Sequence, residues 1–161
     1  MSPRALAQIG SAEAQVNLHL QQVLSVQVSQ ASVSIPMNTP VHYLQGNSTP
    51  QLTNHLQVSA TASYVLRVRT ENDYFNLNSG ISTLPVNTVQ LKLTENGATG
   101  VNVLTPKSLS STDTDIVTSN ANEVVQNFNA TYEIPQSETE NYLNREEGSY
   151  STTVIYTIVP Q

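Results

Sequence analysis

Side chains that could hold a calcium ion occur in two predicted loops. The first loop carries Asp73 and Asn76, and the second carries Asp113 and Asp115. Carboxylate and amide oxygens are the ligands that Ca²⁺ takes, but neither loop has the spacing of an EF-hand. Turns rich in Asp and Asn are also explained by side chains that bond their own backbone. We therefore treat these four residues as weak calcium candidates and expect the protein to need no metal or organic cofactor.

Three histidines, His19, His42 and His55, are the other candidates for metal binding or proton transfer. Each lies in or beside a predicted strand. None has a second histidine or a carboxylate at the spacing that a metal site needs. We interpret all three as ordinary polar residues of strands.

Acidic residues are paired twice, as Glu138/Glu140 and Glu146/Glu147, within the polar stretch SETENYLNREEGS. A catalytic acid needs burial or a close like charge to raise its pKa, and a solvated loop provides little of either. The chain also has no Ser-His-Asp order, no glycine-rich phosphate loop and no G-x-S-x-G turn. The sequence therefore predicts a protein that is not an enzyme.

The composition predicts a polar surface that carries few charges. Charged residues make up 11% of the 161 residues, against a usual value of about 25%, and Ser, Thr, Asn and Gln take their place. Such a composition is typical of secreted β-proteins, so we expect an extracellular or cell-surface location. The net charge is −6 with only six Lys and Arg residues, which argues against nucleic-acid binding. No apolar run approaches the roughly 20 residues of a transmembrane helix.

The first residues differ in character from the rest of the chain. Residues 1–14 contain tripeptides of the small-x-small type seen before signal-peptidase sites, but they lack the apolar stretch of a signal peptide. We expect residues 1–14 to be a leader, a signal remnant or an N-terminal extension. Residues 15–161 are then a single domain, which fits the usual domain size.

Apolar residues alternate with polar ones over residues 15–30. A period of two places alternate side chains on one face of a strand, whereas a helix would scatter them around its axis. The run is longer than a typical strand, so we expect two strands or one strand bent near residues 21–23. The apolar set is Val16, Leu18, Leu20, Leu24, Val26 and Val28.

Further short alternating segments follow, separated by turns rich in Gly, Pro, Asn, Asp and Ser. This pattern is typical of an all-β protein, and we predict an Ig-like or pilin-like sandwich of about seven to nine mostly antiparallel strands. Only residues 119–128 suggest a helical turn. The strands are expected within 32–36, 41–44, 51–60, 63–70, 87–94, 101–104, 126–135 and 150–159. The predicted core includes Leu24, Val26, Leu56, Val58, Leu66, Val68, Val89, Leu91, Phe128, Tyr132, Val154, Tyr156 and Ile158.

Several of these segments resemble a family of small secreted β-sandwich proteins from Bacteroidota-type bacteria. The most specific are NHLQVSA, the LPV strand and the closing pattern G-x-Y-x-x-x-V-x-Y-x-I, and the resemblance covers roughly residues 15–161. The closing pattern is also similar to the last strand of fimbrial subunits, particularly the alpha-class chaperone–usher pilins. This resemblance implies an Ig-like sandwich without a catalytic site.

Two strands of the predicted sandwich lack an obvious partner. The terminal strand, with Val154, Tyr156 and Ile158, is uncharged and would aggregate if it were left bare. The N-terminal run offers Val16, Leu18 and a third apolar residue, Leu20, to fill a groove. We predict a structural subunit of an extracellular filament or fimbria-like appendage, assembled with copies of itself or related subunits by β-strand donation.

Two alternatives remain open at this point. The N-terminal strand could instead complete its own sheet. The protein could also be a monomeric surface adhesin or carbohydrate-binding module, although its few aromatic residues form no cluster in the sequence.

Overall fold

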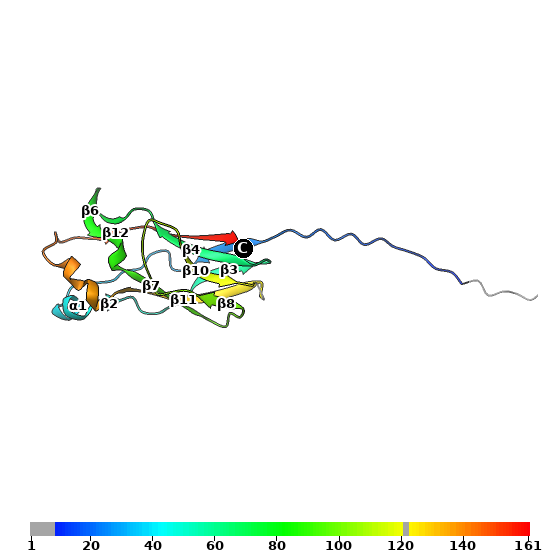
Figure 1. Cartoon of the computed structure of the whole chain (residues 1–161), viewed down its shortest axis with the longest axis horizontal. Coiled ribbons are helices and arrows are strands. Elements are labelled where there is room, and N and C mark those ends of the chain that lie inside the picture. Colours follow the sequence, from blue (N-terminus) through cyan, green and yellow to red (C-terminus); the bar gives the residue numbers. More distant parts are fainter. Residues whose placement is uncertain (1–8, 121–122) are drawn as a thin grey trace, which may run out of the picture.

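Two antiparallel sheets pack face to face in a computed structural model that describes residues 9–120 and 123–161 (Figure 1). The larger sheet has the strand order β1-β3-β11-β7-β9, with β2 added beside β11. Its strands are β1 (Leu24–Val28), β2 (Asn47–Ser48), β3 (Leu52–Ala60), β7 (Gln90–Glu95), β9 (Lys107–Ser108) and β11 (Val125–Ile134).

The second sheet has the order β13-β4-β10-β8, and a small third sheet has the order β12-β5-β6. Their strands are β4 (Tyr64–Thr70), β5 (Tyr74–Leu77), β6 (Gly80–Pro85), β8 (Val101–Val103), β10 (Thr114–Ser119), β12 (Tyr150–Ser151) and β13 (Val154–Pro160). The all-β sandwich is thus confirmed. The described residues form thirteen strands, more than the seven to nine predicted, and three of them, β2, β9 and β12, are only two residues long.

The core lies between the two main sheets, where the period-two pattern predicted it. Leu66 and Val68 on β4 are buried, while Arg67 and Arg69 between them reach solvent. Of the thirteen predicted core residues, eight are buried. The other five pack against the core while partly exposed, namely Leu24, Val26, Val154, Tyr156 and Ile158. All five of these lie on β1 or β13, at the same side of the sandwich, so the sandwich is least well covered there.

Three local predictions were wrong. Residues 41–44 belong to helix α1 (Pro40–Gln45) rather than to a strand, because the Thr39 side chain caps the first turn and Pro40 has the backbone angle of a first helical residue. Residues 32–36 lie in a loop. The described residues of the expected helical turn at 119–128 form no helix: Ser119 ends β10 and residues 125–128 begin β11, while residues 121–122 lie outside the described residues. Two short 3₁₀ helices complete the fold, η1 (Val86–Thr88) and η2 (Gln136–Tyr142).

The N-terminal run forms a strand over only part of its length. Residues 24–28 pair with β3, whereas residues 9–22 leave the sandwich as an extended arm (Figure 1). Residues 1–8 of the predicted leader lie outside the described residues. We call residues 9–22 the arm, because Val23 is the first residue held to the sandwich by hydrogen bonds.

The two ends of the sandwich differ in what they carry. The end that we call the base holds the turn from β3 to β4, and there β1 begins opposite Ala60 while β13 ends opposite Tyr64. The other end, the tip, carries α1 packed against η2. Figure 1 shows the arm leaving from the base, along the long axis and away from the tip.

Candidate functional site

A large open groove lies along the side of the sandwich where the two sheets end in β1 and β13. Its volume is about 1240 Å³. One wall is the loop after β1, residues 30–40, and the other is the segment 145–156 that leads into β13. Apolar side chains from both layers line it, including Val28, Ile35, Met37, Phe75, Leu84 and Val154.

The groove is open because β1 is shorter than the strand beside it. β1 ends at Val28, opposite Leu56, whereas β3 continues toward the tip from Leu56 back to Leu52. Ser29 still donates its backbone N–H to the His55 carbonyl at 2.9 Å. Asn54, the next residue of β3, has a positive φ of 53°, which bends the strand. Beyond this bend the chain after β1 leaves the sheet and uncovers the inner face.

The opposite wall is a sheet edge with one free side. Within the described residues, β13 pairs only with β4, so its outer backbone edge has no strand beside it. Thr152 and Thr153 belong to no strand and connect β12, which pairs with β5, to β13, which pairs with β4. The Thr152 hydroxyl is buried in this wall and has no hydrogen-bond partner among the described residues. A buried hydroxyl without a partner is unusual in a completed sheet.

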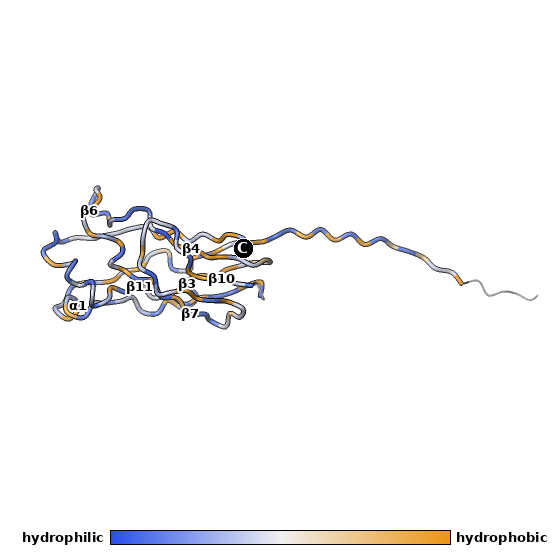
Figure 2. Tube along the Cα trace, in the orientation of Figure 1, coloured by the Kyte–Doolittle hydropathy of each residue, from blue (hydrophilic) through white to orange (hydrophobic). Residues whose placement is uncertain are grey.

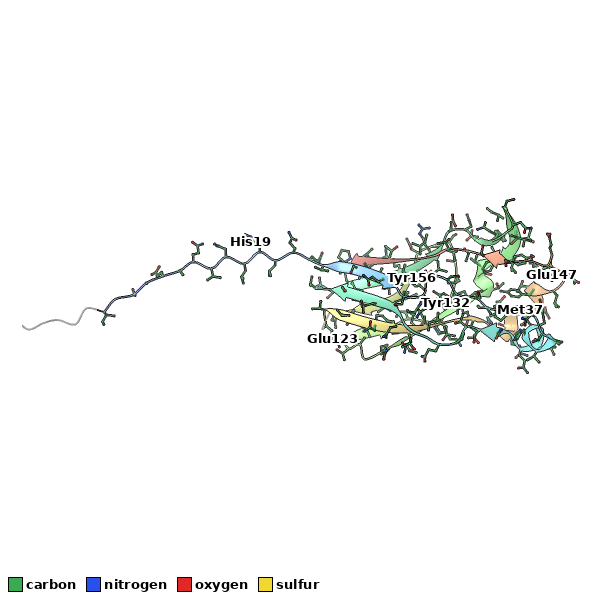
Figure 3. The ribbon with its side chains drawn as sticks, turned by 180° about the vertical axis from the view of Figure 1, so that it is seen from behind. His19, Met37, Glu123, Tyr132, Glu147 and Tyr156 are labelled. Carbon is green, nitrogen blue, oxygen red and sulfur yellow. The ribbon has the colours of Figure 1, made fainter. Side chains whose placement is uncertain are left out.

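The floor of the groove contains one hydrogen-bonded polar cluster. His55 Nδ1 lies 2.7 Å from the Gln30 amide oxygen, and His55 Nε2 lies 2.8 Å from the Tyr132 hydroxyl. The Tyr132 hydroxyl in turn bonds that of Tyr156 on β13. These bonds connect β3, β11 and β13 and so tie the two sheets together. Figure 3 labels Tyr132 and Tyr156 close to one another within the sandwich.

Burial keeps the members of this cluster neutral. It lowers the pKa of His55 and raises the pKa of Tyr132 to about 12. Burial also raises the pKa of Tyr156 well above its usual value, and the neighbouring Tyr132 adds to this rise. An imidazole that donates from Nδ1 to Gln30 accepts at Nε2 from Tyr132, which is the pattern of a neutral histidine. The cluster therefore stabilises the structure, and none of its pKa values is shifted toward one that suits acid–base catalysis near neutral pH.

The arm carries the apolar residues that were predicted to fill a groove. Val16, Leu18 and Leu20 are 80%, 81% and 93% exposed. Figure 2 shows the alternation along the arm as bands of apolar and polar residues. The arm makes no hydrogen bond to the sandwich in the described residues. Three large apolar side chains on one face of an extended segment are thus left without a partner.

Three of the four weak calcium candidates have protein partners in the structure. Asp115 pairs with Arg67 at 2.8 Å, and Asp113 lies 3.9 Å from Arg69. Asp73 accepts a hydrogen bond from Ser111. Asn76 lies on β5, opposite Ser151 of β12 and away from those ion pairs. Within residues 9–120 and 123–161, no group of three or more His, Asp or Glu side chains could hold a metal ion.

We interpret His55 from the sequence as an ordinary polar residue of a strand, and the sequence does not predict its place in this buried cluster. Strict alternation in β3 would put His55 on the outer face, because Leu56 and Val58 face inward. In the structure both His55 and Leu56 are buried, because Asn54 bends the strand just before them. Asparagine tolerates a positive φ better than most residues, and this is the only local signal of the bend.

No family model matches this chain, and no curated protein matches it. No helix in the described part of the chain is long and apolar enough to cross a membrane.

Proposed function

We propose that this protein is a non-enzymatic structural subunit of an extracellular filament, joined to the next copy by donation of its arm. The proposal rests on one observation: the same molecule has an extended arm without a partner and a groove that a strand could fill. An extended arm exposes three alternating apolar side chains, and a groove between two sheet edges is lined in part by apolar side chains from both layers. In strand addition, the main-chain hydrogen bonds give affinity and alternate side chains give specificity.

The directions of the strands fit donation from one copy to the next. The arm runs toward the base of its own subunit, where β1 begins. If that base meets the tip of a second copy, the arm enters the groove of the second copy at its tip. Residue 22 then lies at the tip of the second copy, and residue 9 lies deepest, nearest to the base of that copy. The arm then runs antiparallel to β13, whose residues run from the tip side to the base. Antiparallel pairing is slightly more stable per residue than parallel pairing.

Insertion into the groove of the same subunit is less favourable. The arm would have to reverse direction just before Val23, pass β1 and reach the open half of the groove near the tip. It would then lie parallel to β13. The two sheet edges already approach each other at the base half, where β1 contacts β13. The arm therefore has a shorter and better paired route into a second copy.

Burial of the three apolar side chains gives the contact its strength. Full burial of a Val or Leu side chain contributes about 1.5–3 kcal/mol relative to exposure. A shift by one residue would turn all three toward solvent, so the register of the inserted arm is strict.

The proposed location is outside the cell. The surface has few charges for its size, and the described residues have only three ion pairs, all partly exposed. A filament of copies related head to tail does not close on itself, which suits a long surface structure.

The proposal is tested by removing the arm and then supplying it as a peptide. A variant without residues 1–22 should remain a folded monomer, because the arm makes no hydrogen bond to the sandwich in the described residues. The full chain should assemble, as seen by sedimentation and electron microscopy. A peptide of residues 9–22 should bind the truncated protein and raise its melting temperature by mass action.

The matched control is the same peptide with Val16, Leu18 and Leu20 replaced by serine, which should not bind. A full chain that stays monomeric at high concentration, with the arm protected from proteases, would show that the arm occupies its own groove. That result would contradict the filament and leave a monomeric surface module as the function.

A further inference from the structure

We infer that successive subunits also touch through two apolar patches, one at the base and one at the tip. This inference rests on the proposed strand donation and adds a second contact surface to it. The base patch consists of Val23, Val124 and Val125, and the tip patch consists of Val41, Leu44 and Leu143. The occupant of each patch is the opposite patch of a second copy of this chain.

The base patch surrounds the point where the arm leaves the sandwich. Val23 and Val124 flank the end of β3, since Val23 accepts a hydrogen bond from the N–H of Thr61 and Val124 accepts one from that of Ala60. Val23, Val124 and Val125 are 47%, 61% and 46% exposed. About half of each of these apolar side chains therefore remains in contact with solvent in the single subunit.

The tip patch lies at the mouth of the groove. Val41 and Leu44 are on α1 and are 55% and 67% exposed, and Leu143 directly after η2 is 52% exposed. α1 packs against η2, which brings the two elements side by side. Both elements also contribute to the groove, through Pro40, Tyr43 and Tyr142. An arm that enters the groove from the tip therefore passes this patch.

The length of the chain between the last apolar residue of the arm and the base forces the two patches together. Only Gln21 and Gln22 lie between Leu20 and Val23. Three residue steps of extended chain span at most about 11 Å. If Leu20 of the donor lies just inside the mouth of the acceptor groove, Val23 of the donor lies within about 11 Å of Leu20. The base of the donor must then rest against the tip of the acceptor.

The flanks of the sandwich contrast with these two ends. On the outer face of the smaller sheet, Arg67 and Arg69 pair with Asp115 and Asp113. On the larger sheet, Lys92 pairs with Glu133. Contiguous exposed apolar side chains on a soluble protein usually mark a contact surface. Here such groups occur at both ends of the long axis, as an end-to-end contact requires.

The test separates the end contact from strand insertion. A tip variant carries Val41→Ser, Leu44→Ser and Leu143→Ser, and a base variant carries Val23→Ser and Val124→Ser. Sedimentation velocity measures assembly of each full chain. Binding of the peptide of residues 9–22, which lacks Val23, to the arm-deleted protein measures strand insertion alone. Leu44→Met is the conservative control. Ile81→Ser is the control for an apolar residue of similar exposure on β6, which Figure 1 shows on the other side of the tip from α1.

We expect both patch variants to require at least about tenfold more protein for assembly, a change of roughly 1.4 kcal/mol. Peptide affinity should stay within about twofold in the arm-deleted tip variant, and both controls should assemble normally. Normal assembly of the base variant would overturn the inference, because that variant leaves the groove intact. Failure of the peptide to bind the unsubstituted groove would instead reject strand donation itself, and the end contact with it.

Discussion

The arm and β13 have similar apolar patterns, but β13 packs on the sandwich and the arm does not. Both have apolar residues at every second position, although β13 also carries Ile155 and Val159 on its other face, and both lie at a margin of the domain. Val154, Tyr156 and Ile158 pack against the core and pair with β4. Val16, Leu18 and Leu20 project into solvent. The difference is that β13 has a sheet edge beside it in its own chain, whereas the arm leaves from the base and points away from the open groove (Figure 1).

This contrast shows what alternation can and cannot predict. A period of two predicts that a segment will form a strand with one apolar face. It does not predict which chain supplies the partner. That depends on where the segment is attached and on which edges the rest of the sandwich leaves uncovered.

The largest expected effect compares a leucine of the core with a leucine of the arm. Leu66→Ala should lower the free energy of unfolding of the protein by about 2–5 kcal/mol, because Leu66 is fully buried and its truncation leaves a cavity. Leu18→Ala should leave the stability of the monomer unchanged. Urea denaturation at a concentration below assembly measures both. An equal loss of unfolding free energy in both variants would mean that the arm packs on its own sandwich, and it would contradict the contrast between the arm and the core.

A smaller effect concerns the hydroxyl that joins β13 to the larger sheet. Tyr156→Phe removes one bond of the buried cluster and leaves the Tyr132 hydroxyl without that partner. We expect a loss of about 1–3 kcal/mol in the free energy of unfolding. Tyr150→Phe is the control, since its hydroxyl bonds the Glu146 carbonyl at an exposed site and should matter little. If Tyr156→Phe left the free energy of unfolding unchanged, packing alone would hold β13 in place.

Acidification should destabilise the sandwich through His55. Burial lowers the pKa of His55 below its usual 6.5 in the folded state, so below pH 6.5 the unfolded chain binds more protons than the folded one. Stability from this residue is therefore present above pH 6.5 and falls as the pH drops below it. The melting temperature of the arm-deleted protein should decrease between pH 7 and pH 5.

His19 and His55 sharpen the same comparison, because one lies on the arm and the other in the groove floor. In the full chain, His19→Gln should leave the pH dependence of melting as it is. His55→Gln should flatten it, and an NMR titration of the His55 ring in the unsubstituted protein should give a midpoint below 6.5. A normal or raised midpoint would contradict the burial argument.

The smallest expected effect is that of metal removal. Because Asp113 and Asp115 are paired with arginines on β4, we expect EDTA to leave the melting temperature unchanged. A clear drop that added Ca²⁺ reverses would show a bound ion and would reopen the two Asp- and Asn-rich loops as sites.

Much of the sandwich could be predicted from alternation alone. The inward-facing residues of β3, β4, β7 and β11 follow the pattern, as Leu66 and Phe128 illustrate. The errors came where local chemistry competes with it. Thr39 and Pro40 start a helix in a segment that reads as a strand. Asn54 turns His55 inward, against the period of its strand.

The groove could not be predicted from the sequence. It depends on the length of β1, which ends opposite Leu56, whereas β3 extends four residues farther toward the tip, to Leu52. It also depends on the loop after β1, which turns away from β3. Both are relations between segments far apart in the chain. The sequence predicted only the other half of the proposed contact, the alternating face of the arm, because that is a local property.

The orientation of the arm has a mechanical consequence. It lies along the long axis of the molecule (Figure 1), so a pull on two subunits joined by it acts parallel to the inserted strand. The main-chain hydrogen bonds on β13 would then share the load in shear and would have to break together, rather than open one after another from an end. Such a joint resists force far better than its equilibrium affinity alone suggests.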